Sequence, residues 1–168
     1  MKNRPALRSS GGLACVGLLD SLNWKGLLIG ILGFLVFYFL AAFGLSQRFF
    51  PNNGISMSRF FALTPALVIL VLANGLREEL WFRGLFLRRY GRFLAPFSSN
   101  ALAAVIFASF HVQVQYSRSL AFFLVIALIE GLLLGLLMQK SRSLWAAAIL
   151  HAGTDIPIFL VYLSSASR

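Results

Sequence analysis

Residues 120–138 read LAFFLVIALIEGLLLGLLM, a stretch in which Glu130 is the single ionisable side chain. At ~1.5 Å per residue, a helix of this length nearly crosses a hydrocarbon core roughly 30 Å thick. The run is continuous, whereas the strands of a membrane β-barrel alternate in short segments. We therefore predict a transmembrane helix here.

Other apolar runs surround this one. There are four of them, which with Leu120–Met138 make five runs in all: Trp24–Leu45, Arg59–Tyr90, Pro96–Val114 and Leu144–Leu163. The Arg59–Tyr90 run is longer than one span requires, so we predict a bend or break at Gly75. The predicted fold is an all-α, polytopic transmembrane helix bundle of about five spanning helices, with the motif-bearing helices forming a central polar cavity.

The composition of the chain agrees with a membrane protein. Of 168 residues, 59% are hydrophobic and 12% are charged, and the mean hydropathy is +0.82. A soluble domain of this size has too little interior for so much apolar surface. The net charge of +10 lies largely between apolar runs, which favours anionic lipid over nucleic acid. With Cys15 as its single cysteine, the chain has no intrachain disulfide framework.

The charges between the runs predict an orientation. We expect a basic leader at 1–20 and one transmembrane domain at 21–168, with a motif-bearing core at 60–163. If the N-terminus is inside, the inner side carries Lys2, Arg4, Arg8, Arg88, Arg89, Arg92, Lys140 and Arg142. The outer side then carries Arg48, Arg59, Arg118 and Arg168. The positive-inside rule then predicts a cytoplasmic N-terminus, in what we expect to be a bacterial inner membrane. The oligomeric state is left open.

Several ionisable residues lie inside the apolar runs, where each costs several kcal/mol and is seldom kept without a task. They are Glu78, Glu79, Arg83, His111, Glu130, His151 and Asp155. Counted from the ends of their runs, Glu78, His111 and His151 each lie ~14–20 Å deep. Because they share the middle layer of the bilayer, we predict that these groups meet in one site.

Spacing within the helices adds chemistry. Glu79 and Arg83 are four residues apart, so we predict an ion pair on one helix face. Glu78 points about 100° away from that face and is free for other work. His151 and Asp155 are also four apart and can address one point in the bundle interior.

Three short motifs in these runs resemble a known family. They are EELWFR at 78–83, FASFH at 107–111 and HAGTD at 151–155, which read as E-E-x-x-x-R, F-x-x-x-H and H-x-x-x-D. In this order they resemble the type II CAAX prenyl endopeptidase and bacteriocin-processing (CPBP, or Abi) intramembrane protease family. The resemblance covers roughly Ala62 to Tyr162.

The resemblance implies peptide-bond hydrolysis within the membrane. Glu78 would be the general base, and His111 would help it to activate water. His151 and the fourth residue after it would stabilise the oxyanion. The commonest pattern has Asn at that last position, where this chain has Asp155. An ionised Asp cannot donate a hydrogen bond, so Asp155 either donates in its protonated form or orients His151.

The need for a metal is left open by the sequence. The resemblance implies that Glu79 and Arg83 hold the site in shape. Glu78, His111 and His151 are of suitable types to bind a divalent metal such as zinc. The sequence has no H-E-x-x-H helix, however, and a Glu–His pair can activate water without a metal.

We therefore expect an intramembrane endopeptidase whose substrates are small membrane-associated, lipidated or C-terminal-tail peptides. Its partners would be such a peptide or protein and the lipid bilayer. Two alternatives remain. One is a catalytically inactive scaffold or bacteriocin-immunity protein with the same fold, and the other is a proton or ion carrier that uses the Glu/His cluster as a relay.

Overall fold

The computed structural model describes residues 23–44, 55–113 and 119–166, and within them it contains helices and short connections but no strand. The elements are α1 (Trp24–Ala42), α2 (Met57–Glu79), η3 (Leu80–Leu87), α3 (Arg88–Tyr90), α4 (Pro96–Phe110), α5 (Leu120–Ser141) and α6 (Leu144–Ala166). The predicted all-helical bundle is confirmed. The predicted leader at 1–20 lies outside the described residues, as do Arg48, Arg118 and Arg168.

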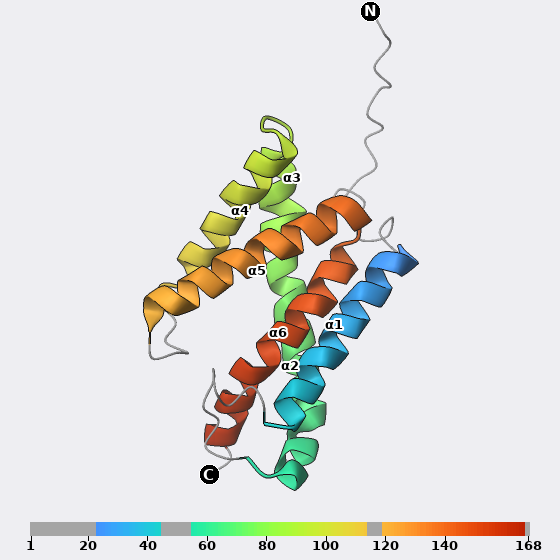
Figure 1. Ribbon diagram of the computed structural model, residues 1–168, viewed down its shortest axis with the longest axis vertical. Coiled ribbons are helices and arrows are strands. Elements are labelled where there is room, and N and C mark those ends of the chain that lie inside the picture. The colour runs from blue at the N-terminus through green and yellow to red at the C-terminus, as the bar shows by residue number, and fades with distance from the viewer. Residues whose placement is uncertain (1–22, 45–54, 114–118, 167–168) are drawn as a thin grey trace, which may run out of the picture.

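Helix α6 is the centre of the bundle. It packs against α1, α2 and α5, while α4 packs against α5 on the other side of the molecule (Figure 1). In the most apolar part of α6, 61% of the residues are buried, against 17% to 28% in the other three long helices. By length and composition, four of the described helices are able to cross a membrane. The other long helices thus present most of their apolar surface outward, as lipid contact requires.

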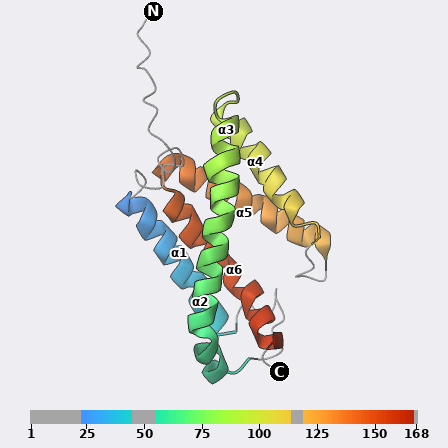
Figure 2. The ribbon, with the colours of Figure 1, turned by 180° about the vertical axis from the view of Figure 1, so that it is seen from behind.

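The predicted break at Gly75 is wrong. Residues Met57–Tyr90 form one continuous helical segment, which crosses the front of the molecule in Figure 2. A Cβ on Gly75 would lie 2.7 Å from the carbonyl oxygen of Ala148. Gly75 is therefore a point of close approach between α2 and α6, and this contact offsets the low helix propensity of glycine. The irregular part is η3, a stretch of wider π-helical turns of the kind often found at functional sites.

Helix α4 is shorter than the predicted run Pro96–Val114. It starts at Pro96, where a proline costs least, and ends at Phe110. His111 forms the C-cap, and its backbone N–H bonds to the carbonyl of Ala108 at 3.0 Å. The next residues, HVQVQ at 111–115, alternate polar and apolar side chains, so the predicted run extended too far.

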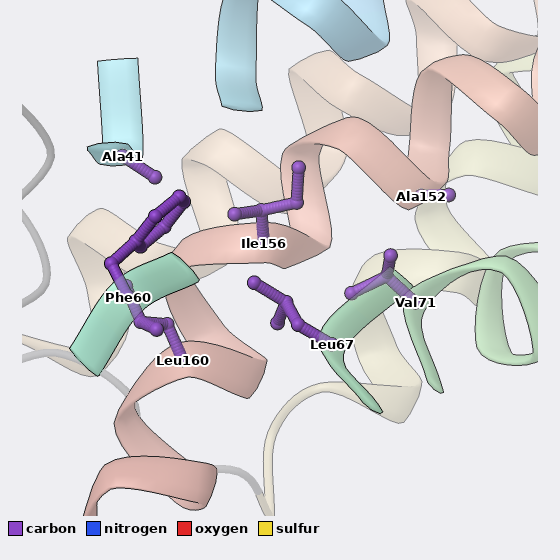
Figure 3. Close-up of a cluster of buried hydrophobic side chains, with 7 residues drawn as sticks. All are labelled: Ala41, Phe60, Leu67, Val71, Ala152, Ile156 and Leu160. Atoms are coloured by element: carbon purple, nitrogen blue, oxygen red, sulfur yellow. The ribbon is translucent and has the colours of Figure 1, made fainter. Parts of the chain in front are cut away.

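Apolar side chains from α1, α2 and α6 form one core cluster. In Figure 3 they point toward one another: Ala41, Phe60, Leu67, Val71, Ala152, Ile156 and Leu160. A second cluster joins η3, α4 and α5 and consists of Phe82, Phe107, Ala108 and Ala127. These clusters fix α2 and η3 against α6 and α4, the helices that carry the three motifs.

Candidate active site

The predicted ion pair between Glu79 and Arg83 is confirmed. Arg83 Nη1 lies 2.5 Å from Glu79 Oε1, and the two side chains are 1% and 0% exposed. Arg83 Nη2 also donates to the carbonyl of Gly131 in α5 at 3.0 Å, and its guanidinium lies over the Phe107 ring at 4.7 Å. The pair therefore ties the end of α2 and the start of η3 to α5 and α4.

His151 joins this buried pair to the other carboxylates. Its Nδ1 lies 2.8 Å from Glu79 Oε1. Because an ionised carboxylate only accepts, Nδ1 carries the proton. The opposite ring atom, Nε2, lies 3.7 Å from Glu78 Oε2 and 3.8 Å from Asp155 Oδ1. His151 is 1% exposed and does not line the neighbouring cavity, so it contacts the site through Glu78 and Asp155.

His111 stands at the end of α4, beside the same site. Its Nδ1 lies 2.8 Å from the carbonyl oxygen of Phe107 and donates to it, which leaves Nε2 of the neutral ring as an acceptor. Phe107 is fully buried, with its ring centroid 4.6 Å from that of His111 and 5.5 Å from that of His151. Phe107 therefore forms an apolar wall beside both histidine rings.

A cavity of about 940 Å³ opens beside these residues. Its wall includes Glu78, His111 and Asp155, together with Asn74 and Arg77 of α2. The remaining lining is largely apolar: Leu70, Ala73, Trp81, Phe82, Phe86, Phe110, Ile158, Phe159, Tyr162 and Leu163. An apolar pocket with a few convergent polar groups is the usual form of a ligand or active site.

The donors at the site do not form a metal centre. Among the described residues, no group of three His, Cys, Asp or Glu side chains is arranged to hold a metal ion. The set considered from the sequence, Glu78, His111 and His151, therefore does not fit a metal site in this structure.

The comparison with family models agrees with the motifs. The family model described as type II CAAX prenyl endopeptidase Rce1-like matches residues 60–157. The chain belongs to this family. No curated protein and no solved structure matches the chain. The matched residues include all three motifs, and family membership makes this Rce1-like chain an integral membrane protein of the CAAX-type protease class.

Two features of this Rce1-like site were missed by sequence reasoning. The first is the Glu79–His151 contact, which joins residues 72 positions apart and has no signal in helical spacing. The second is Asn74, which donates to both Glu78 and Asp155. Its signal was present, because Asn74 is a polar residue in an apolar run, one helical turn before Glu78.

Glu130, which matches none of the motifs, bonds to a neighbouring helix. Its Oε1 accepts a short hydrogen bond from Thr154 Oγ1 of α6. Glu130 is not among the residues that line the cavity. In this Rce1-like chain Glu130 therefore links α5 to α6 at Thr154, which is the residue before Asp155.

Proposed function

We propose that this protein is a glutamate-dependent intramembrane endopeptidase that cuts lipidated or C-terminal-tail peptides of membrane-associated substrates. The observation that carries the proposal is the cavity wall, where Glu78, His111 and Asp155 converge in an otherwise apolar surface. Family membership supports the protease class, and the individual roles proposed below start from those that the motif resemblance implies.

Glu78 acts as the general base. Its Oε1 accepts from Asn74 Nδ2 at 3.1 Å and from Arg77 Nη2 at 3.3 Å. Its Oε2 is buried and takes no hydrogen bond from a described residue. With one oxygen fixed, the carboxylate keeps an unpaired acceptor, Oε2, that takes a proton once a water reaches it. The resulting hydroxide attacks the peptide carbonyl carbon, and the C–N bond breaks as that proton passes to the leaving amine.

The two histidines take different parts. His111 presents the acceptor Nε2 to the cavity and helps Glu78 to hold the attacking water. In its protonated form, His151 donates from Nε2 and stabilises the negative oxygen of the tetrahedral intermediate, because a positioned donor in a water-poor site is worth most there. Asp155 Oδ1 lies 3.8 Å from His151 Nε2 and orients that ring.

The shape of the cavity suits a substrate with a lipid chain. Its aromatic and aliphatic lining can receive an isoprenyl or acyl group, while the polar groups face the scissile bond. Arg77 is 67% exposed at the side chain and is the one cationic residue that lines the cavity within the described ranges. We expect it to face the charged C-terminal end of the peptide.

We also propose an inside N-terminus. The start of α1, the α3–α4 connection and the α5–α6 connection lie toward one end of the bundle (Figure 1). The described basic residues of that end are Lys25, Arg88, Arg89, Arg92, Lys140 and Arg142. The positive-inside rule places it in the cytoplasm. The bacterial inner membrane stays a prediction.

The test uses purified protein in proteoliposomes with a set of prenylated, acylated and unmodified C-terminal peptides, and mass spectrometry identifies the products. Glu78→Gln keeps the shape of the side chain and removes the base, so we expect kcat to fall at least about 100-fold. Glu130→Gln is the matched control, because Glu130 does not line the cavity, and we expect kcat within about threefold.

Each other outcome has a clear meaning. Equal cleavage by wild type and Glu78→Gln would show that Glu78 is not the base. No cleavage of any peptide, with proton flux across the vesicles, would favour the carrier. No cleavage and no flux would favour an inactive scaffold. Loss of cleavage with a chelator, restored by zinc, would overturn the metal-free chemistry.

A further inference from the structure

Asn74 connects two carboxylates that come from different helices. Its side-chain Nδ2 lies 3.1 Å from Glu78 Oε1 in α2 and 2.9 Å from Asp155 Oδ2 in α6. One amide nitrogen carries two hydrogens, so each carboxylate receives one. Asn74 is half-buried and lines the cavity, and so it stands between the base and the last motif residue.

Arg77 determines which way the amide points. Its Nη2 lies 2.6 Å from Asn74 Oδ1. A guanidinium only donates and an ionised carboxylate only accepts. The orientation with Oδ1 toward Arg77 and Nδ2 toward the carboxylates is therefore the one that satisfies all three contacts, and the reversed amide would satisfy none.

No other described side chain gives Glu78 or Asp155 a hydrogen bond equal to the one from Asn74. Asp155 takes no other hydrogen bond from a described side chain, and its nearest other partner is His151 Nε2 at 3.8 Å. Without Asn74, Glu78 Oε1 would keep only the longer contact to the exposed Arg77 side chain. Two like charges on one cavity wall would then face each other without a shared donor.

We propose that Asn74 is a positioning residue for hydrolysis. It holds Glu78 Oε1 and Asp155 Oδ2 at one amide nitrogen and so fixes the orientation of the base relative to α6. This inference rests on the proposed function. The role requires a side chain with two N–H donors, because the amide joins the two carboxylates. A residue without a donor would let them separate.

The experiment compares Asn74→Leu with Asn100→Leu. Asn100 is a buried asparagine that does not line the cavity, and its Nδ2 donates to Leu132 O between α4 and α5. We expect Asn74→Leu to lower kcat about 100-fold with KM within about threefold, since hydrogen bonds to charged groups are lost at the base. We expect Asn100→Leu to lower the yield of folded protein and to leave kcat per folded molecule unchanged.

A double-mutant cycle with Asp155→Asn separates positioning from structure. In that background one of the two charges is gone, so Asn74→Leu should lower kcat only about tenfold further. Unfolding of the same four proteins in detergent should show a coupling of about fivefold or more in the unfolding constant. This second readout needs no substrate, so it decides the bridge even if no peptide is cleaved.

Opposite results overturn the inference. These are an unchanged kcat in Asn74→Leu, a loss confined to KM or to folded yield, or additive effects in the unfolding cycle. If Glu78→Gln abolishes the cleavage seen with wild type and Asn74→Leu retains it, the role of Asn74 alone is refuted. Equal cleavage by wild type and Glu78→Gln would refute the proposed base, and the unfolding cycle would still judge the bridge.

Discussion

Arg83 is the side chain whose removal should lower the free energy of unfolding most. Arg83→Leu keeps an aliphatic side chain but deletes the guanidinium that contacts Glu79, Gly131 and Phe107. Glu79 would stay buried, with His151 Nδ1 as its remaining hydrogen-bond partner among the described residues and with Oε2 already unpaired. The change therefore leaves a carboxylate in an apolar interior without its main counter-charge.

The magnitude follows from this burial. Removing one partner of a buried ion pair costs about 3–5 kcal/mol, and the lost hydrogen bond from the charged guanidinium to the Gly131 carbonyl adds about 1.5–3 kcal/mol. Native proteins are stable by about 5–15 kcal/mol, so we expect a loss of about half of the free energy of unfolding. The assay is denaturant unfolding in detergent micelles, followed by circular dichroism.

A matched substitution supplies the control. Arg77→Leu removes the same chemical group from a side chain that is 67% exposed, where an ion pair contributes about 0–1 kcal/mol. The double variant Glu79→Leu with Arg83→Leu should recover much of the lost stability, because a buried pair is often replaceable by apolar residues. If Arg83→Leu destabilised the protein by no more than Arg77→Leu does, the reasoning from burial would be refuted.

Two further changes test contacts around α6. A Cβ on Gly153 would lie 2.7 Å from Phe34 Cα of α1, so Gly153→Ala should destabilise the protein by about 1–3 kcal/mol in the same unfolding assay; an unchanged midpoint would mean that α1 and α6 are farther apart. Thr154→Val removes the hydroxyl that Glu130 accepts from and should cost about 1–3 kcal/mol, with the Thr154→Ser variant retaining wild-type stability; equal stabilities of the two variants would contradict this contact.

Local sequence spacing predicted the parts of this site that lie within one helix. Residues four apart meet on a helix face whatever surrounds them, which is why the Glu79–Arg83 pair was predictable. Contacts between helices depend on crossing points that spacing does not contain. The approach of His151 to Glu79 is one example, and the donation by Asn74 to Asp155 is another.

The two errors about helices also have physical causes. Glycine weakens an isolated helix, so a break at Gly75 was the natural expectation. In the bundle, the missing side chain instead lets α2 lie against Ala148 and Ala152. The end of α4 was missed because Val112 and Val114 suggested a longer apolar run, while the backbone turns already at His111.

The shortness of α4 affects the lipid around it. Fifteen residues span ~22 Å of helix, whereas a typical hydrocarbon slab is roughly 30 Å thick. A segment with such negative hydrophobic mismatch draws headgroups and their hydration inward, and the leaflet thins beside it. His111 caps the C-terminal end of α4, so the thinned leaflet would bring bulk solvent down toward the cavity that His111 lines.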